Sequence, residues 1–184
     1  MFDVLFDVIQ EECIIYLLKN KKILDKFLFT NKQDLSNHLP HYLDTLLLRN
    51  KITIKDIESI FWIYGPGKFS SCRIISVFVK IIKLFNQDIK IYTIDKFSYL
   101  GWKDQSIVIL KSDGNKYFVA EVKKHLLSSK PILINESELK SFIKKQNKNN
   151  IIYDLSNEQL IIDSLPSFKE VNENFELKYF KPVC

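Results

Sequence analysis

Residues 65–68 (Gly-Pro-Gly-Lys) are the segment that most suggests chemistry, because glycines before a helix often bind phosphate through backbone N–H groups. The segment follows the apolar run Ser59–Tyr64, which predicts a buried strand, and precedes a helical pattern. A phosphate-binding P-loop ends in Gly-Lys-Ser/Thr, whereas here Phe69 stands where Ser or Thr is needed. The spacing therefore excludes a P-loop, and by itself the tripeptide predicts a strand-to-helix turn.

Other reactive side chains form no readable catalytic or metal constellation. His38 and His41 have the i,i+3 spacing that a helix brings together, but a proline lies between them and no third ligand is evident, so surface histidines are favoured. His125 stands alone on a Lys-rich strand end. Cys72 lies in a predicted helix beside Arg73 without a positioned base. We therefore expect no catalytic residue, no metal and no cofactor.

The composition is that of a folded protein with a mild excess of positive charge. The 184 residues are 46% hydrophobic, enough for one domain, or for one domain with a small appendage. Lys and Arg number 27 against 22 Asp and Glu, which mildly favours acidic partners such as nucleic acid but fixes no site. No basic-then-apolar leader is visible, and charged residues interrupt the apolar runs. We expect a cytoplasmic protein.

The apolar spacing predicts alternating strands and helices. β-Branched and aromatic runs predict strands, and leucines at helical spacing, from Leu35 to Leu47, predict a helix with Ser36 or Asn37 as its cap and Pro40 in its first turn. A hairpin is predicted at Asp113-Gly114. The expected strands are Phe2–Ile9, Cys13–Leu18, Lys22–Phe29, Ser59–Tyr64, Ile91–Ile94, Gln105–Ser112, Lys116–Lys123, Ile151–Tyr153 and Leu177–Phe180; further helices are expected over Phe69–Asn86 and Glu136–Gln146, the latter capped by Asn135 and Glu138.

The helix from Phe69 is unusually apolar. Helical spacing places its polar residues in one narrow stripe, consisting of Arg73, Ser76, Lys80, Lys83 and Gln87. A helix that packs only on its own sheet needs about a third of its circumference apolar, and this helix has more. Either it is covered on several sides within its own domain, or one face meets another subunit.

Several segments, in order along the chain, resemble the bacterial TsaB (YeaZ) family. The family's strand-to-helix segment G-P-G-S-F-T-G-L-R-I is matched by Gly65, Pro66, Gly67, Phe69, Arg73 and Ile74. Weaker matches are Leu5-Phe6-Asp7 with Glu11-Glu12-Cys13, Leu39-Pro40 with its trailing leucines, Ile52 to Ile60, and Leu177 to Pro182. The resemblance is good over residues 1 to about 100 and only suggestive afterwards.

The resemblance implies an α/β fold of the actin/sugar-kinase/Hsp70-like (ASKHA, ribonuclease H-like) class, with mixed sheets and flanking helices. The order predicted from the residues, β-β-β-α-β-α-β, agrees with the first lobe of that fold. We expect this lobe over residues 1–100 and a truncated second lobe over 101–184.

The resemblance also implies a role. TsaB proteins are non-catalytic subunits in tRNA threonylcarbamoyladenosine modification; they pair through two helices with the catalytic subunit TsaD, join a TsaE ATPase, and self-associate in the same way. Direct tRNA binding is not expected, because neither an RNA-binding motif nor an aromatic–basic platform is evident. Mapped onto this sequence, the partner-binding residues are Leu39, Tyr42, Leu43, Leu46, Ile74, Phe78, Ile81 and Phe85.

Nucleotide-binding members of the superfamily hold phosphate in loops rich in hydroxyl residues. Here Asp7 remains as a remnant, but Val8, Ile9 and Gln10 follow it, so this loop looks disabled. The second loop, Leu110 to Gly114, lacks the family's D-A-R pattern. Two alternatives stay open: a stand-alone ASKHA-type ATP-binding enzyme, and a self-associating module unrelated to tRNA.

Overall fold

The computed structural model describes residues 2–30, 34–67, 69–112, 114–146, 150–153 and 158–171. Within them the chain forms two compact units, one containing the residues up to Ile94 and the segment from Phe168, the other Asp95–Ser167. The division falls before Asp95 rather than after residue 100, and the chain returns to the first unit after the second. The predicted strand Leu177–Phe180 lies outside the described residues.

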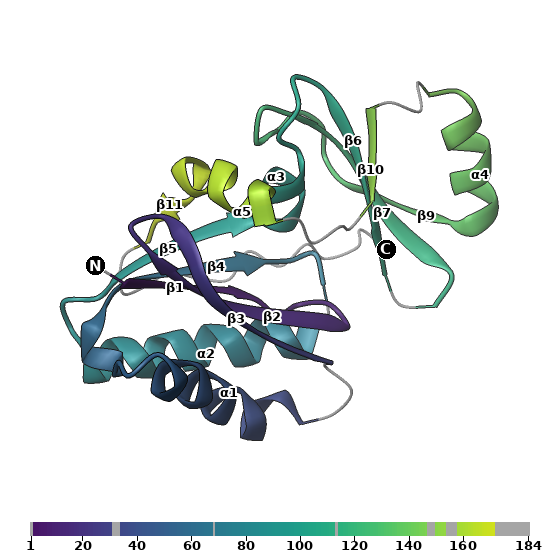
Figure 1. Cartoon of the computed structure of the whole chain (residues 1–184). Helices are drawn as coiled ribbons and strands as arrows, with labels where there is room; N and C mark the ends of the chain where they lie inside the picture. The colour runs from purple at the N-terminus through teal and green to yellow at the C-terminus, as the bar shows by residue number, and fades with distance from the viewer. Residues whose placement is uncertain are drawn as a thin grey trace. The chain divides into compact units, whose positions relative to one another are not determined.

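The first unit is built on a mixed six-stranded sheet with the order β11-β5-β4-β1-β2-β3 (Figure 1). β1 pairs antiparallel with β2, β2 antiparallel with β3, and β1 parallel with β4, as expected for a hairpin meander followed by a helical crossover. The strands are β1 (Phe2–Asp7), β2 (Glu12–Lys19), β3 (Lys22–Thr30), β4 (Ile57–Tyr64), β5 (Lys90–Asp95) and β11 (Lys169–Glu170).

Helices α1 (Leu35–Arg49) and α2 (Phe69–Phe85) lie side by side on one face of this sheet (Figure 1). They cover the inward side chains of the central strands, among them Val4, Phe6 and Ile15, which are buried in one apolar core with both helices. A short 3-10 turn, Ile54–Asp56, leads into β4 and carries a capping box between Thr53 and Asp56. Burial of this shared face is what holds the two helices in place.

The second unit contains a smaller sheet with the order β10-β6-β7-β8, in which β9 also pairs with β7. The capping box of Asn135 and Glu138 is confirmed, and it starts α4 at Glu136 as predicted. The elements are α3 (Lys96–Leu100), β6 (Ser106–Lys111), β7 (Lys116–Lys123), β8 (Leu126–Leu127), β9 (Ile132–Asn135), α4 (Glu136–Lys144), β10 (Ile151–Tyr153), α5 (Glu158–Ser164) and the 3-10 turn Leu165–Ser167.

Candidate protein-docking groove

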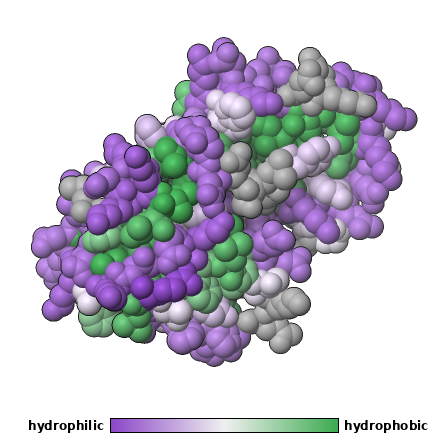
Figure 2. Space-filling model, in the orientation of Figure 1, coloured by the Kyte–Doolittle hydropathy of each residue, from purple (hydrophilic) through white to green (hydrophobic). Residues whose placement is uncertain are grey.

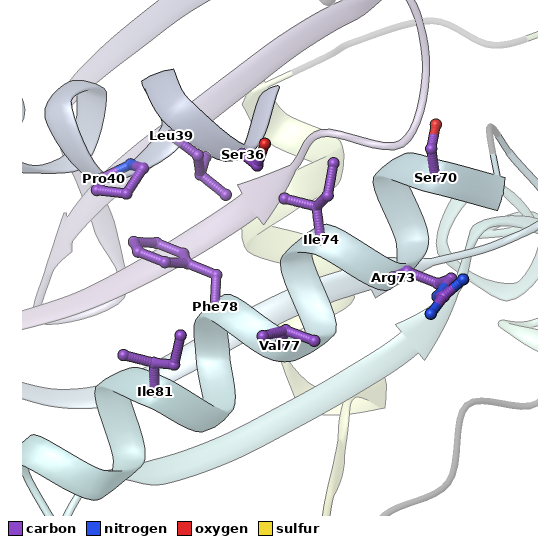
Figure 3. A pocket seen from close by; sticks show the side chains of 9 residues that line it. All are labelled: Ser36, Leu39, Pro40, Ser70, Arg73, Ile74, Val77, Phe78 and Ile81. Carbon is purple, nitrogen blue, oxygen red and sulfur yellow. The ribbon is translucent and has the colours of Figure 1, made fainter. Parts of the chain in front are cut away.

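An apolar groove of about 460 Å³ runs between α1 and α2 on the outside of the first unit (Figure 3). Its walls are aliphatic and aromatic side chains, with two serine hydroxyls and one arginine toward one end. The lining residues are Ser36, Leu39, Pro40, Ser70, Arg73, Ile74, Val77, Phe78 and Ile81.

The residues that α1 contributes to the groove depend on where this helix begins. Asp34 is the residue before the first turn, and its carboxylate accepts hydrogen bonds from the side chains of Ser36 (3.3 Å) and Asn37 (2.6 Å). The prediction that Ser36 or Asn37 caps the helix is therefore wrong. Pro40 consequently lies past the first turn, inside the helix, where it cannot donate a backbone hydrogen bond and instead presents its ring to the groove.

The α2 wall is apolar on its outer side as well as its inner side. Cys72, Ile75, Val79 and Ile82 are buried toward the sheet. Ser76 is buried with them, so its expected place in the polar stripe is wrong. The apolar residues exposed on this helix are Phe69, Val77, Ile81, Leu84 and Phe85, and the last two are 76% and 79% exposed.

The exposed residues of the second half of α2 form a continuous stripe. Val77, Ile81 and Phe85 follow one another at i,i+4, and Leu84 lies three residues after Ile81, so their side chains share one face. Hydrophobic surface is visible in Figure 2 over the part of the molecule where α1 and α2 lie. Within the described part of the chain, α2 is therefore not covered on all sides, which contradicts the first of the two alternatives left open by the sequence.

The structure separates the predicted partner-binding residues into two groups. Leu39, Leu43 and Leu46 are fully or almost fully buried in the core, so they hold α1 on the sheet and are not available as partner anchors. Leu39 forms the floor of the groove, but it has no exposed surface of its own. Tyr42 is half-buried; its ring stacks on Phe27 with the centroids 4.9 Å apart and meets Phe29 at a tilt with the centroids 4.5 Å apart.

The predicted partner-binding residues on α2 either line the groove or are exposed. Ile74 and Phe78 are partly buried and line the groove, and the Phe78 ring meets Phe6 edge-on at 6.0 Å. Ile81 and Phe85 are exposed. Val77, Leu84 and Leu48 are also exposed apolar residues, but they are missing from the predicted partner-binding set. The sequence shows that they are apolar, but it does not show which side of each helix faces solvent.

Of the described residues that line the groove, Arg73 alone carries a charge. Its guanidinium lies 5.7 Å from the ring centroid of Phe69, within cation–π range. At the other end of α2, Lys83 donates hydrogen bonds to the backbone oxygens of Gln87 and Ile89, so its ammonium satisfies carbonyls beyond the helix end. The groove is therefore apolar along its length and positive at the end nearer the N-terminus of α2.

The Gly-Pro-Gly segment joins β4 to α2, as predicted. The Gly65–Pro66 peptide bond is cis. Gly67 lies so close to the β1–β2 loop that a Cβ would stand 2.7 Å from the carbonyl oxygen of Ile9 and 2.9 Å from its Cβ. Close backbone approach, rather than a positive φ, is thus the reason for glycine at this position.

The loop that follows Asp7 is packed with apolar side chains. Asp7 is buried at the end of β1, and Val8 and Ile9 have no exposed surface. Ile9 occupies the space next to Gly67 with an apolar side chain. A phosphate requires hydroxyl or N–H donors at such a position, and branched aliphatic groups offer none.

Other reactive groups are held in structural contacts. Burial raises the pKa of the Cys72 thiol, although a hydrogen bond with the backbone of Gly65 acts in the opposite direction. The reactive thiolate form is therefore disfavoured. His38 and His41 both pack against the ring of Tyr42, at 5.8 and 6.2 Å. No group of three or more His, Cys, Asp or Glu residues that could hold a metal ion is found among the residues that the structure describes.

In the second unit, the predicted hairpin is formed by β6 and β7, and Gly114 in its turn has a φ of 65°. Asp113 lies outside the described residues. His125 lies in the β7–β8 turn, with its Nδ1 2.8 Å from the carbonyl oxygen of Ser98. Over the described residues, no helix is long and apolar enough to cross a membrane.

Comparison with known proteins establishes the fold. No protein-family model matches the chain. An uncharacterized protein of Mycoplasma genitalium, MG208, is 26% identical over 86 residues, covering 47% of this chain and 44% of that protein, so the match spans less than half of each.

Two solved structures from Pseudomonas aeruginosa are similar over nearly the whole chain. One, an uncharacterized protein with similarity to peptidase YeaZ, has a TM-score of 0.75 at 12% identity and covers 97% of this chain and 98% of its own. The other, YeaZ, has a TM-score of 0.66 at 12% identity and covers 90% and 92%. The structural neighbours are YeaZ-like, and the predicted ASKHA-type α/β fold is confirmed.

Proposed function

We propose that this chain is a non-catalytic subunit of a tRNA threonylcarbamoyladenosine modification complex, which docks a TsaD-like catalytic subunit on the α1–α2 face. The exposed apolar face of α2 beside the groove carries the proposal. A TsaE-like ATPase joins the same assembly, and the complex brings tRNA to the catalytic subunit. Residue matches to the TsaB family around Gly65–Ile74 and the YeaZ-like fold support this assignment.

The geometry suits a helical partner. Val77, Ile81, Leu84 and Phe85 present the i, i+4, i+7 and i+8 spacing of helix-to-helix contacts, and the groove beside them accepts side chains from a second helix. Bulky apolar groups at the centre of an interface contribute most of its binding free energy because they are fully desolvated there.

The loop after Asp7 supports a role other than catalysis. Val8 and Ile9 are buried where nucleotide-binding relatives need hydroxyl side chains, and Gly67 packs directly on Ile9. Phosphate would have to displace apolar core atoms to enter this loop. The catalytic chemistry is accordingly assigned to the partner subunit.

The test is binding to the TsaD-like subunit encoded by the same genome, measured by calorimetry with wild type and with Ile81→Asp and Phe85→Asp variants. A charge buried at the centre of an interface costs about 2 kcal/mol or more, so each variant should bind at least about 30-fold more weakly. Leu28→Asp is the matched control, because Leu28 is 59% exposed on the edge strand β3 of the same unit but lies away from the groove.

Three results separate the alternatives. Wild-type protein that does not bind the TsaD-like subunit at micromolar concentration contradicts the proposal. Concentration-dependent self-association of the chain alone, lost in the Phe85→Asp variant but without any binding to the TsaD-like subunit, would instead support the self-associating module. Tight ATP binding by the isolated chain would favour the stand-alone enzyme.

A further inference from the structure

The second unit carries a separate surface pocket beside Trp102. The pocket has a volume of about 600 Å³ and is lined by Trp102, Lys103, Asp104, Gln105 and Asn150. Trp102 is 50% exposed, whereas the other tryptophan, Trp62, is 1% exposed in the core of the first unit. A large aromatic ring that is half in solvent at the wall of this pocket leaves part of the ring available for stacking by a flat ligand.

The segment that presents Trp102 is fixed by its backbone. Gly101 is packed so tightly that a Cβ would stand 2.2 Å from Cγ1 of Val122. The amides of Lys124 and His125 donate hydrogen bonds of 2.9 and 2.8 Å to the carbonyl oxygens of Lys103 and Gly101. The β7–β8 turn therefore holds the backbone of residues 101–103 at both ends, which fixes the point from which the Trp102 side chain extends before any ligand arrives.

The groups around the ring combine three kinds of recognition. The Lys103 ammonium lies 5.6 Å from the centre of the Trp102 ring, and the Lys124 ammonium lies 3.2 Å from Asp104 at the pocket wall. Gln105 and Asn150 supply amides, each with donors and an acceptor. The pocket therefore has an aromatic face, one lining ammonium group and two amides, and the Lys124 ammonium beside it is paired with the lining carboxylate of Asp104. These groups match a planar heterocycle joined to a phosphate when Lys124 is included.

We propose that the Trp102 pocket binds an unpaired nucleotide, with the base stacked on Trp102 and the phosphate placed near Lys103 and Lys124. The amides of Gln105 and Asn150 face the edge of the base. The Lys124–Asp104 ion pair is highly exposed on both sides, so the ammonium can turn to a phosphate at little cost. Free mononucleotides and single-stranded RNA share this chemistry. This inference does not depend on the docking groove.

Fluorescence titration of the full chain tests the site, with adenosine monophosphate, a short single-stranded oligoriboadenylate, an RNA duplex of the same length, and ribose 5-phosphate as ligands. Stacking on Trp102 should quench its emission saturably, and Trp102→Ala should weaken binding, measured by calorimetry, by about 5- to 150-fold. Lys124→Gln should reduce the salt dependence of oligonucleotide binding by about 0.7 in log–log slope. The control is Tyr153→Ala, since Tyr153 is 48% exposed in the same unit but does not line the pocket.

The ligands distinguish the sources. Binding of the monophosphate identifies a nucleotide site, whereas binding of the oligonucleotide alone identifies an RNA-contact site; both support the proposal. Equal binding of ribose 5-phosphate or of the duplex would overturn it, because neither offers an unstacked base. Absence of saturable binding by either nucleotide ligand, or unchanged affinity in Trp102→Ala, would also overturn it.

Discussion

Replacing Gly67 with alanine tests whether the Gly-Pro-Gly joint acts through packing. The added methyl would lie 2.7 Å from the Ile9 carbonyl oxygen and 2.9 Å from the Ile9 Cβ, both inside contact distance. Ordinary contacts begin at 3.4 Å, so the methyl and the β1–β2 loop must separate by about 0.7 Å. Neither neighbour is the end of a flexible side chain, because one is backbone and the other is attached directly to it.

The cost follows from where the movement must occur. Ile9 has no exposed surface, so shifting it disturbs the packed core, and overpacking of this kind costs about 1–3 kcal/mol. Gly67→Ala should therefore lower the free energy of unfolding by that amount, measured by urea denaturation with an unchanged m-value. Gly67→Leu should be destabilised further, because the longer side chain meets the same obstacle.

Gly114→Asn is the matched control. Gly114 has a φ of 65° but nothing within 4 Å of an added Cβ, so its requirement is conformational rather than steric, and asparagine tolerates this region. The control should change the free energy of unfolding by less than about 0.5 kcal/mol. Gly67→Ala with wild-type stability would refute the close-approach explanation, and the joint would then need another account.

Three further results are expected. Leu46→Ala should destabilise the protein by about 2–5 kcal/mol in urea denaturation, because Leu46 is fully buried under the sheet; a loss below 1 kcal/mol would contradict its place in the core. Burial opposes ionisation of Asp25, but hydrogen bonds from Asn50 and Arg49 outweigh it and lower the pKa of Asp25; the resulting stabilisation is present above the unfolded pKa and is lost as pH falls through the folded one. Arg49→Met should therefore cost up to about 1 kcal/mol at pH 7, and the cost should shrink only as pH falls below 3.8, the ordinary Asp value, and through the lower folded-state pKa; a pH-independent difference would argue against the ion pair. Burial raises the pKa of Asp3, and a hydrogen bond with Ser59 partly offsets that rise. The contribution of Asp3 to folding stability is therefore full below its unfolded-state pKa and is lost as pH rises through its folded-state pKa. Asp3→Asn should accordingly raise the melting temperature at pH 7 but not near pH 3.

The elements that sequence patterns predicted well are those with strong local periodicity. β2, β3 and the hairpin of β6 and β7 follow from β-branched runs and turn residues, and α4 follows from its capping box. The elements that were not expected are short or depend on distant partners. α3 has five residues, too few for a helical period, and β11 has two residues whose strand character comes only from pairing with β5.

The candidate site shows the same limit at the level of side chains. The helical spacing of the leucines in α1 correctly predicted a helix with one apolar face, but this pattern does not distinguish a leucine in the core from a leucine in an interface. Leu39 and Leu43 were therefore assigned to a partner although the sheet already covers them. Exposure depends on which face the sheet occupies, and that is decided by packing across the whole unit.

The sequence by itself determined that Gly65, Pro66 and Gly67 form a strand-to-helix joint, that this joint is not a P-loop, and that α2 is too apolar for a simple surface helix. Each of these is a statement about residue types over a short span, where steric and spacing rules apply directly. Only the tertiary structure decided that Gly67 meets Ile9, that Phe85 remains exposed, and that Trp102 borders a pocket with Asn150. Such contacts join residues far apart in the chain, and local patterns carry no information about which distant surfaces meet.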